Sequence, residues 1–195
     1  MKRLMDVVFS FFILMVFLPF GLIIAMCIAL ESRGGIFYRQ ERIGLGGKPF
    51  MLLKFRSMRP NADRQGKLTV GERDPRITRA GVFVRKYKLD EFPQFINVLT
   101  GEMSVVGPRP EVMEYVCHYT AEQRKVLDYK PGITDLASIS YFEENKILAK
   151  SKDPQRTYLE EIMPAKIRIN IEYQAKANVW RDLGVVWKTA MRMMR

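Results

Sequence analysis

An apolar segment near the start of the chain dominates the sequence: residues 7–30 read VVFSFFILMVFLPFGLIIAMCIAL and carry no charged side chain. About 20 apolar residues in an α-helix span the hydrocarbon core of a bilayer, because each residue advances the helix by about 1.5 Å. A helix of this length in a soluble core would need a polar face, and the segment has a single hydroxyl side chain, Ser10. The sequence therefore predicts a membrane segment over residues 1–30.

Three membrane arrangements compete for this segment. A cleaved signal peptide is disfavoured because the apolar run is too long and no small-residue cleavage site follows it, and a lipoprotein site at Cys27 would need a small residue where Met26 stands. Both flanks are net positive, and positive flanks prefer the cytoplasm. Pro19 removes a helix hydrogen bond near the middle and bends the axis. We therefore favour a re-entrant hairpin bent at Pro19 over a kinked spanning helix.

The remaining composition describes a basic, folded domain. The 195 residues suit one compact domain, and 48% hydrophobic with 27% charged residues exclude a disordered chain. The formal net charge of +11 indicates an anionic partner, which nucleic acid, acidic lipid headgroups or phosphorylated small molecules would all satisfy. The single histidine, His118, makes a histidine-based metal site or catalytic triad improbable. We expect residues 31–195 to form a cytoplasmic catalytic domain.

Local patterns in residues 31–195 predict a mostly helical α+β fold with a small β-hairpin. Residues 36–41 and 49–55 read as strands, and the glycine-rich residues 44–47 between them suit a turn. These glycines do not suit a phosphate-binding loop, because Pro49 stands where a serine or threonine belongs. Residues 59–76 are expected to form a loop. A helix is predicted over residues 91–100. Further helices are predicted to begin at the capping box formed by Thr120 and Gln123, at Pro154 and at Pro164.

The last part of the chain predicts an amphipathic helix at the membrane interface. Its apolar face would contain Val179, Trp180, Leu183, Val186, Trp187, Met191 and Met194, with Arg181, Asp182, Lys188, Arg192 and Arg195 off that face. Tryptophan and methionine opposite arginine and lysine suit a helix lying among lipid headgroups. A helix packed on the domain core fits the pattern equally well, and the upstream membrane segment favours the interface.

Two adjacent acids, Asp90 and Glu91, are the candidate catalytic residues. Such pairs at a helix start usually act as caps. Here they follow a dense series of bases: Arg73, Arg76, Arg79, Arg85, Lys86 and Lys88. We expect these cations to keep Asp90 ionised, so that it could act as a nucleophile on a phosphoryl group. Glu91 could bind Mg²⁺, which takes one or two protein carboxylates together with phosphate oxygens and water.

Several cations are candidates for binding substrate phosphate. Arg109 lies between two prolines, which lowers the entropy lost when its guanidinium is held in place for a bidentate phosphate contact. Lys54 and Arg56 alternate along one strand and therefore share a face. The alternative for each is an ordinary surface salt bridge. The predicted phosphate-binding set is Lys54, Arg56, Arg76, Arg79, Arg85 and Arg109.

At these residues the sequence resembles the bacterial sugar transferases, the monotopic phosphoglycosyl transferase family. The resemblance rests on KLDEFPQFINVL at residues 88–99 and GEMSVVGPRP at residues 101–110. Further matches are RQERIG at 39–44, KFRSM at 54–58, DPRITR at 74–79 and KPGIT at 130–134. The resemblance covers nearly the whole chain. Because only a catalytic core is present, the chain resembles the small members of the family.

The resemblance implies transfer of a sugar phosphate from a UDP-sugar to a polyprenol phosphate, usually undecaprenyl phosphate, with release of UMP and a requirement for Mg²⁺. It implies that Asp90 attacks the β-phosphorus and forms a phosphosugar-enzyme intermediate in a ping-pong reaction, and that Glu91 binds Mg²⁺. It further implies a place on the cytoplasmic face of the bacterial inner membrane, in contact with membrane lipid. A homodimer is compatible with this arrangement, and no nucleic-acid partner is expected.

The chain departs from the family pattern at three places. Leu18 stands before Pro19 where the family has serine, which affects the expected bend. After Thr134 the chain continues with Asp135 and Leu136, where many members read Gly-Trp. Asn170 stands where many members have an acid. The last two regions could bear on the choice of sugar or nucleotide.

Two other functions are weighed against this one. A non-catalytic, membrane-tethered protein that binds anionic lipid or nucleic acid is compatible with the charge of +11, although residues 31–195 contain no clear RNA- or DNA-binding motif. A transferase that works through a ternary complex of both substrates differs in mechanism alone. Release of UMP distinguishes the first alternative, and a trapped sugar phosphate on the protein distinguishes the second.

Overall fold

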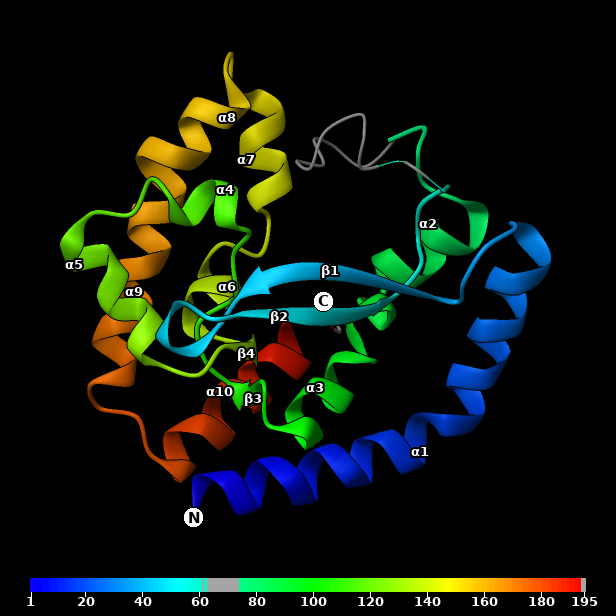
Figure 1. Ribbon diagram of the computed structural model, residues 1–195, viewed down its shortest axis with the longest axis horizontal. Helices are drawn as coiled ribbons and strands as arrows, with labels where there is room; N and C mark the ends of the chain where they lie inside the picture. Colours follow the sequence, from blue (N-terminus) through cyan, green and yellow to red (C-terminus); the bar gives the residue numbers. More distant parts are fainter. Residues whose placement is uncertain (61, 63–73, 194–195) are drawn as a thin grey trace.

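The structure, a computed structural model, describes residues 1–60, 62 and 74–193. The described part is mostly helical and has two small two-stranded sheets (Figure 1), which confirms the predicted α+β class. The α-helices are α1 Lys2–Glu31, α2 Arg79–Lys86, α3 Gln94–Thr100, α4 Met113–Val116, α5 Ala121–Arg124, α6 Leu136–Ser140, α7 Glu144–Lys150, α8 Pro154–Thr157, α9 Met163–Gln174 and α10 Val179–Met193. The strands are β1 Phe37–Ile43, β2 Pro49–Phe55, β3 Ser104–Val106 and β4 Gly132–Thr134. Most of the predicted loop over residues 59–76, with Arg73, and the residues Met194 and Arg195 lie outside the described residues.

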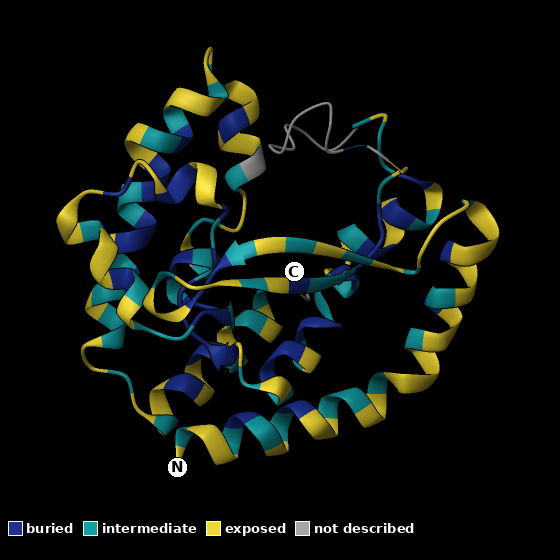
Figure 2. Ribbon diagram, in the orientation of Figure 1, coloured by how far each residue is buried: buried dark blue, intermediate teal, exposed yellow. Residues whose placement is uncertain are grey.

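Helix α1 is one bent helix that contains Pro19. Figure 1 shows that its two halves lie along two sides of the molecule. It is bent at an angle and does not fold into two antiparallel arms, because proline removes a single hydrogen bond without ending the helix. Its outward side is apolar (Figure 2), with exposed Leu4, Val8, Phe11, Phe12, Met15, Val16, Leu18, Phe20, Leu22, Ile23, Met26 and Leu30. By length and hydropathy this helix fits membrane association.

The inward side of α1 is attached to the domain by polar contacts near its start and apolar contacts near its end. The buried carboxylate of Asp6 accepts hydrogen bonds from the Ser104 hydroxyl at 2.8 Å and the Val105 N–H at 3.1 Å. Arg3 donates to two carbonyl groups at the end of α3. Ile24 and Ile28 pack in a core cluster with residues of β2 and α2. Both halves of the bent helix are therefore fixed to the domain.

The predicted hairpin is present. Strands β1 and β2 pair antiparallel, with Phe37 opposite Phe55 and Ile43 opposite Pro49. Gly46 and Gly47 in the turn have φ of 67° and 74°, a conformation that glycine adopts without steric cost. The alternative of a phosphate-binding loop is therefore not needed to explain these glycines.

A second sheet was not predicted from the sequence. Strands β3 and β4 pair in parallel, with Ser104 opposite Gly132 and Val106 opposite Thr134. The chain crosses closely after β3: a Cβ atom on Gly107 would lie 2.3 Å from the Lys130 carbonyl oxygen, so a side chain there would force the backbones apart. Strands of three residues are too short to show a period in the sequence, which is why this pairing was missed.

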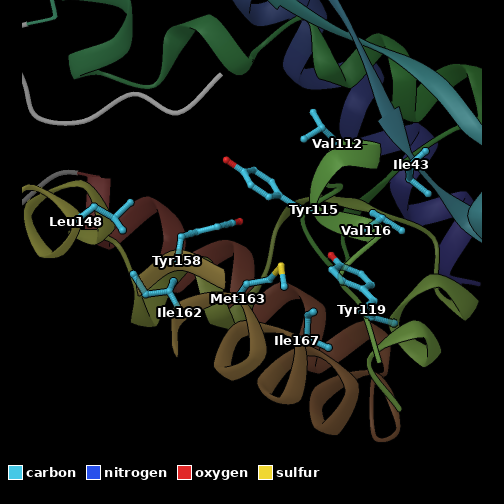
Figure 3. Packing of buried hydrophobic residues seen from close by; sticks show 11 residues of the cluster. Ile43, Val112, Tyr115, Val116, Tyr119, Leu148, Tyr158, Ile162, Met163 and Ile167 are labelled. Carbon is cyan, nitrogen blue, oxygen red and sulfur yellow. The ribbon is translucent and has the colours of Figure 1, made fainter. Parts of the chain in front are cut away.

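Helices α4, α5, α7, α8 and α9 surround a separate hydrophobic cluster (Figure 3), to which Tyr115, Tyr119, Tyr158 and Ile162 belong. The capping box at Thr120 and Gln123 is confirmed, and the Asp153 carboxylate caps α8. The helix predicted to begin at Pro164 is instead the continuation of α8 through a π-helical turn at Tyr158–Ile162. Such a turn accommodates the hydrogen bond that Pro164 cannot donate.

Helix α10 combines a buried acid with an exposed aromatic face. Trp180 is 81% exposed and Trp187 is 68% exposed, whereas Val185 packs in the core cluster beside β3. Asp182, predicted to lie off the apolar face, is 0% exposed. Its carboxylate accepts hydrogen bonds from Lys2 and Tyr173, both at 2.7 Å. The side of the helix that faces the protein therefore carries Asp182 and Val185, whereas Arg181 and Lys188 are exposed, and the aromatic residues Trp180 and Trp187 are free to contact lipid headgroups.

Candidate functional site

The segment that carries the two candidate acids is held tightly against α1. After α2 the backbone turns at Lys88, whose φ of 55° is in the left-handed region, and a 3₁₀ turn follows at Leu89–Glu91. Directly after this turn, Phe92 stacks on Phe17 of α1 with ring centroids 3.7 Å apart. The catalytic turn is therefore positioned by packing on the membrane helix.

Glu91 is bound by two cations that come from different parts of the chain. Arg109 donates a hydrogen bond to Glu91 Oε1 at 2.8 Å, and Lys54 Nζ lies 3.4 Å from the same oxygen. Burial alone would raise the pKa of Glu91, but the charges of Arg109 and Lys54 outweigh it and hold the pKa well below its usual range. Glu91 is therefore ionised at neutral pH. The structure brings together three of the predicted site residues here.

Asp90 is buried beside this ion pair and is only partly satisfied. Among the described residues, none donates a hydrogen bond to Asp90 Oδ1. Burial, followed by the negative charge of Glu91, raises the pKa of Asp90, while Lys54 and Arg85 oppose this increase. The expectation that the nearby cations keep Asp90 ionised stays a prediction: the cations do lower its pKa, and burial, which the sequence does not show, acts in the opposite direction. The result is a carboxyl group with an unused oxygen in a site of reduced dielectric.

Asn97 positions the end of β2 that carries Lys54. The Asn97 side chain accepts from the Leu53 N–H at 3.0 Å and donates to the Met51 carbonyl at 2.8 Å and to Glu102 at 2.7 Å. The bonds to Leu53 and Met51 attach β2 to α3 immediately before Lys54. Burial lowers the pKa of Lys54 to about 8, although Glu91 counteracts the shift. Asn97 lies within the family-like sequence KLDEFPQFINVL, but its spacing alone does not indicate this role.

A cavity of about 1150 Å³ opens over the two acids. Its lining contains five of the six predicted phosphate-binding residues: Lys54, Arg56, Arg76, Arg85 and Arg109. Arg79 is not part of that lining and its side chain is exposed. Its backbone N–H and that of Ala80 bind the Glu31 carboxylate, so this position connects α1 to α2.

Two of the lining arginines are engaged in internal contacts. The Arg56 guanidinium donates to the carbonyl groups of Ser32 and Arg33 at 2.7 and 3.0 Å and thereby braces the end of α1. Arg76 pairs with Asp74 at 2.6 Å. Lys54 and Arg109 instead contact Glu91 directly. The phosphate-binding role of each residue stays a prediction.

A divalent cation would have to be held by few protein groups. In the part of the chain that the structure describes, no three histidine, cysteine or acidic side chains are grouped to hold a metal ion. Mg²⁺ needs only one or two protein carboxylates when phosphate and water supply the other oxygens. Glu91 and Asp90, two adjacent carboxylates in the cavity lining, fit that requirement.

Comparison with known proteins gives a family match over the whole chain. The family model described as bacterial sugar transferase matches residues 1–195. The UDP-glucose:undecaprenyl-phosphate glucose-1-phosphate transferase of Escherichia coli is 36% identical over 98% of this chain and 40% of its own length. The protein of the same name from Caulobacter vibrioides is 35% identical, over 99% of this chain and 69% of its own length.

A third relative has a different sugar in its name. The UDP-N-acetylgalactosamine-undecaprenyl-phosphate N-acetylgalactosaminephosphotransferase of Aeromonas hydrophila is 34% identical, over 96% of this chain and 42% of its own length. The chain thus spans about two fifths of the length of the Escherichia coli and Aeromonas proteins. With the family model matched from end to end, this chain belongs to the bacterial sugar transferase family.

Proposed function

We propose that this chain transfers a sugar 1-phosphate from a UDP-sugar to undecaprenyl phosphate and releases UMP. The observation that supports this most strongly is the buried Asp90 carboxyl with one unbonded oxygen, beside a Glu91 held by Lys54 and Arg109 in a large basic cavity. The names of the relatives contain the same acceptor. Transfer of this kind would be a first membrane step in building a bacterial glycan.

In the first step, an oxygen of ionised Asp90 attacks the β-phosphorus of the UDP-sugar. A bond forms between that oxygen and phosphorus, and the bond from phosphorus to the bridging oxygen of the diphosphate breaks. UMP leaves with the bridging oxygen, and the sugar phosphate remains on Asp90 as an acyl phosphate. Lys54 and Arg109 offset negative charge that develops on the departing phosphate, since preorganised cations stabilise such charge in a buried site.

In the second step, a phosphate oxygen of undecaprenyl phosphate attacks the same phosphorus. The bond between phosphorus and Asp90 breaks, the carboxylate is restored and the sugar becomes attached to the lipid through a diphosphate. No water is consumed, so exclusion of water from the cavity prevents hydrolysis of the intermediate. The raised pKa of Asp90 is consistent with a carboxylate that gains little from solvation and reacts readily once ionised.

Mg²⁺ is part of this proposal. Glu91 and Asp90 would hold the ion, and when bound it would supply charge neutralisation for the diphosphate. The chain's own contribution is the placement of Glu91, which Arg109 and Lys54 keep ionised at neutral pH.

We assign the protein to the cytoplasmic face of the bacterial inner membrane as a monotopic protein. The bend in α1 and its apolar outer side suit a helix that enters one leaflet and returns. The exposed Trp180 and Trp187 of α10 suit the headgroup layer. The catalytic turn packs on α1 through Phe92, so the reacting carboxyl would lie close to the height at which a lipid phosphate is presented.

Release of UMP tests this function. The full chain in nanodiscs is incubated with undecaprenyl phosphate, Mg²⁺ and each of several UDP-sugars. We expect UMP release with at least one of them, and its loss when the acceptor or Mg²⁺ is left out of multiple-turnover reactions. A protein that only binds anionic lipid or nucleic acid would release no UMP at any protein concentration.

A further inference from the structure

The cavity extends well beyond Asp90 and Glu91, and its two sides differ in charge. On the side of α2, it is lined by the cations Arg59, Arg76, Arg85, Lys86 and Lys88. On the side of α4, α7 and the α8–α9 helix, it is lined by two acids and three tyrosines, namely Glu111, Glu144, Tyr115, Tyr141 and Tyr158. Figure 1 shows α2 near one end of the β1–β2 hairpin and these helices near its other end. Apart from the catalytic pair, Glu111 and Glu144 are the acids among the described lining residues.

The cations on the acidic side are each engaged by a partner. Arg42 Nη1 lies 3.4 Å from Glu111 Oε2, and Lys166 Nζ lies 2.7 Å from Glu144 Oε2. Arg192 lies over the ring of Phe142, with its guanidinium carbon 5.1 Å from the ring centroid. This side of the cavity is therefore near neutral in charge and rich in groups that form hydrogen bonds. It suits an uncharged polar ligand better than a phosphate.

The groups on this side are held in fixed positions. The Tyr158 hydroxyl donates to Glu111 Oε1, while Arg42 binds the other carboxylate oxygen. Arg42 is itself fixed by the side chain of Gln40 at 2.8 Å and by the Pro110 carbonyl at 3.0 Å. Figure 3 shows Tyr158 beside Tyr115, and their ring centroids are 5.0 Å apart. Rigid carboxylate and hydroxyl groups beside aromatic faces are typical of sites that orient a small polar ligand.

A UDP-sugar placed with its β-phosphorus at Asp90 presents two unlike ends. One end, the nucleotide, carries the negative charge of the diphosphate, and the other end, the sugar, is neutral and rich in hydroxyl groups. Electrostatic complementarity directs the nucleotide toward the cations of α2 and the sugar toward the opposite side. We infer that Glu111, Tyr158, Glu144 and Lys166, hereafter the sugar wall, bind the sugar ring and determine which UDP-sugar is used; this inference rests on the proposed function.

The sugar wall can discriminate between epimers because it consists of buried hydrogen-bonding groups. A site built to bond a given hydroxyl rejects an analogue that places it elsewhere, since the site's own polar groups are then left without partners. The relatives named above differ in the sugar of their names, and residues that contact the sugar ring are the ones expected to determine such a choice.

The test compares kcat/KM for a panel of UDP-sugars in the full chain. The panel contains UDP-glucose, UDP-galactose and their N-acetylamino counterparts, with UMP release as the signal. The variants are Tyr158→Phe, which keeps the ring but removes the hydroxyl, and Glu144→Gln, which keeps the shape but removes the charge. Inhibition by UDP, which has no sugar to bind, is measured in parallel.

We expect the ratio of kcat/KM between the preferred UDP-sugar and its C4 epimer to change about fivefold to tenfold in each variant, as for the loss of one hydrogen bond. UDP inhibition should change less than about twofold. Matched controls are Tyr119→Phe, in the same hydrophobic cluster but not in the cavity lining, and Glu160→Gln, an exposed residue that pairs with Arg156. Neither control should change the ratio.

Three results would overturn the inference. An equal decrease for every UDP-sugar and for UDP would place the nucleotide on this wall. Ratios that match those of the two controls in both variants would reduce the wall to a structural role. A wild-type protein that releases no UMP from any UDP-sugar would overturn the proposed function together with the inference, whereas an active wild type with unchanged ratios overturns the inference alone.

Discussion

Two buried aspartates, Asp182 and Asp90, differ in how many of their carboxylate oxygens have hydrogen-bond partners. Asp182 of α10 has both carboxylate oxygens occupied, one by the Tyr173 hydroxyl and the other by the Lys2 ammonium group, each at 2.7 Å. Asp90, in the catalytic turn, has an Oδ1 that no described residue contacts through a hydrogen bond. A satisfied acid fixes the structure, whereas an unsatisfied one is costly in the free protein and available to a ligand.

The same contrast extends to the elements on which these residues lie. Lys2 and Asp6, at the start of α1, form hydrogen bonds with α10 and β3. These bonds connect α1 to α10 and to β3. The turn that carries Asp90 and Glu91 packs on α1 through Phe92 and Phe17, and Glu91 is bound by Arg109 and Lys54, whereas Asp90 Oδ1 has no hydrogen-bond partner among the described residues. Substitutions at Asp90, Asp182, Asn97 and Trp187 each change one side of this contrast.

The largest effect is expected for Asp90→Asn. Loss of the nucleophile should lower turnover by at least about a thousandfold, or about 4 kcal/mol in activation free energy. The free energy of unfolding should not fall, because the variant removes a poorly solvated carboxyl from a buried position. UMP release and chemical denaturation measure the two quantities. Near-normal turnover would refute the assignment, and Glu122→Gln, on the exposed surface, serves as the unaffected control.

Asp182→Ala should have the opposite profile. It leaves Tyr173 without its acceptor, while Lys2, which is 38% exposed, keeps the Val106 carbonyl as an acceptor. The cost should therefore come mostly from the lost hydrogen bond to a buried charge and amount to about 2 to 3 kcal/mol. The free energy of unfolding, measured by denaturation in detergent, should fall by about that amount. Turnover of the folded fraction should remain within about threefold of wild type, because Asp182 does not line the cavity. An unchanged unfolding curve would show that this acid is not needed to join α1 to α10.

A smaller effect is expected where the two kinds of environment meet, at Asn97. Asn97→Ala removes two hydrogen bonds that attach β2 to α3 and a third to Glu102, which should cost about 2 kcal/mol in unfolding free energy. It should also lower kcat about tenfold, since Lys54 would be held less firmly beside Glu91. Thr100→Ala, which loses hydrogen bonds to the Asn97 carbonyl and to Glu102 but none to β2, is the matched control. If both variants lose the same small amount of activity, Asn97 does not position Lys54.

The smallest effect on activity is expected for a substitution on the exposed face of α10. The chain contains two tryptophans, Trp180 and Trp187, and both belong to this face, so intrinsic tryptophan fluorescence reports on α10 alone. Lipids brominated near the headgroup should quench most of that fluorescence in reconstituted protein. Trp187→Phe should retain activity within about twofold, because a ring of similar size still contacts the lipid. Emission that brominated lipids leave unchanged would mean that the face is covered by protein or water.

The sequence revealed those parts of the molecule that depend on local patterns. The apolar run of α1 with Pro19, the β1–β2 hairpin and the capping box at Thr120 follow from residues that are neighbours in the chain. Asp90 and Glu91 could be proposed because a family-like motif surrounds them. Each of these features is contained within about 30 consecutive residues.

Features that depend on distant residues were missed. Lys2 meets Asp182 across almost the entire chain, and no periodicity connects them. Arg56 and Arg79 stay predicted phosphate ligands, but the sequence does not show that the first braces the end of α1 or that the second lies outside the cavity lining. The sequence also does not show the burial that raises the pKa of Asp90.

The most direct measurement is the mass of the intact protein after incubation with a UDP-sugar and Mg²⁺ in the absence of acceptor. Wild type should gain the mass of one sugar phosphate, release one UMP for each molecule labelled, and lose the label when undecaprenyl phosphate is added. Peptide mapping should locate the label at Asp90, and Asp90→Asn should gain none. UMP release that requires both substrates at once, with no adduct at any time, would contradict a covalent intermediate on Asp90.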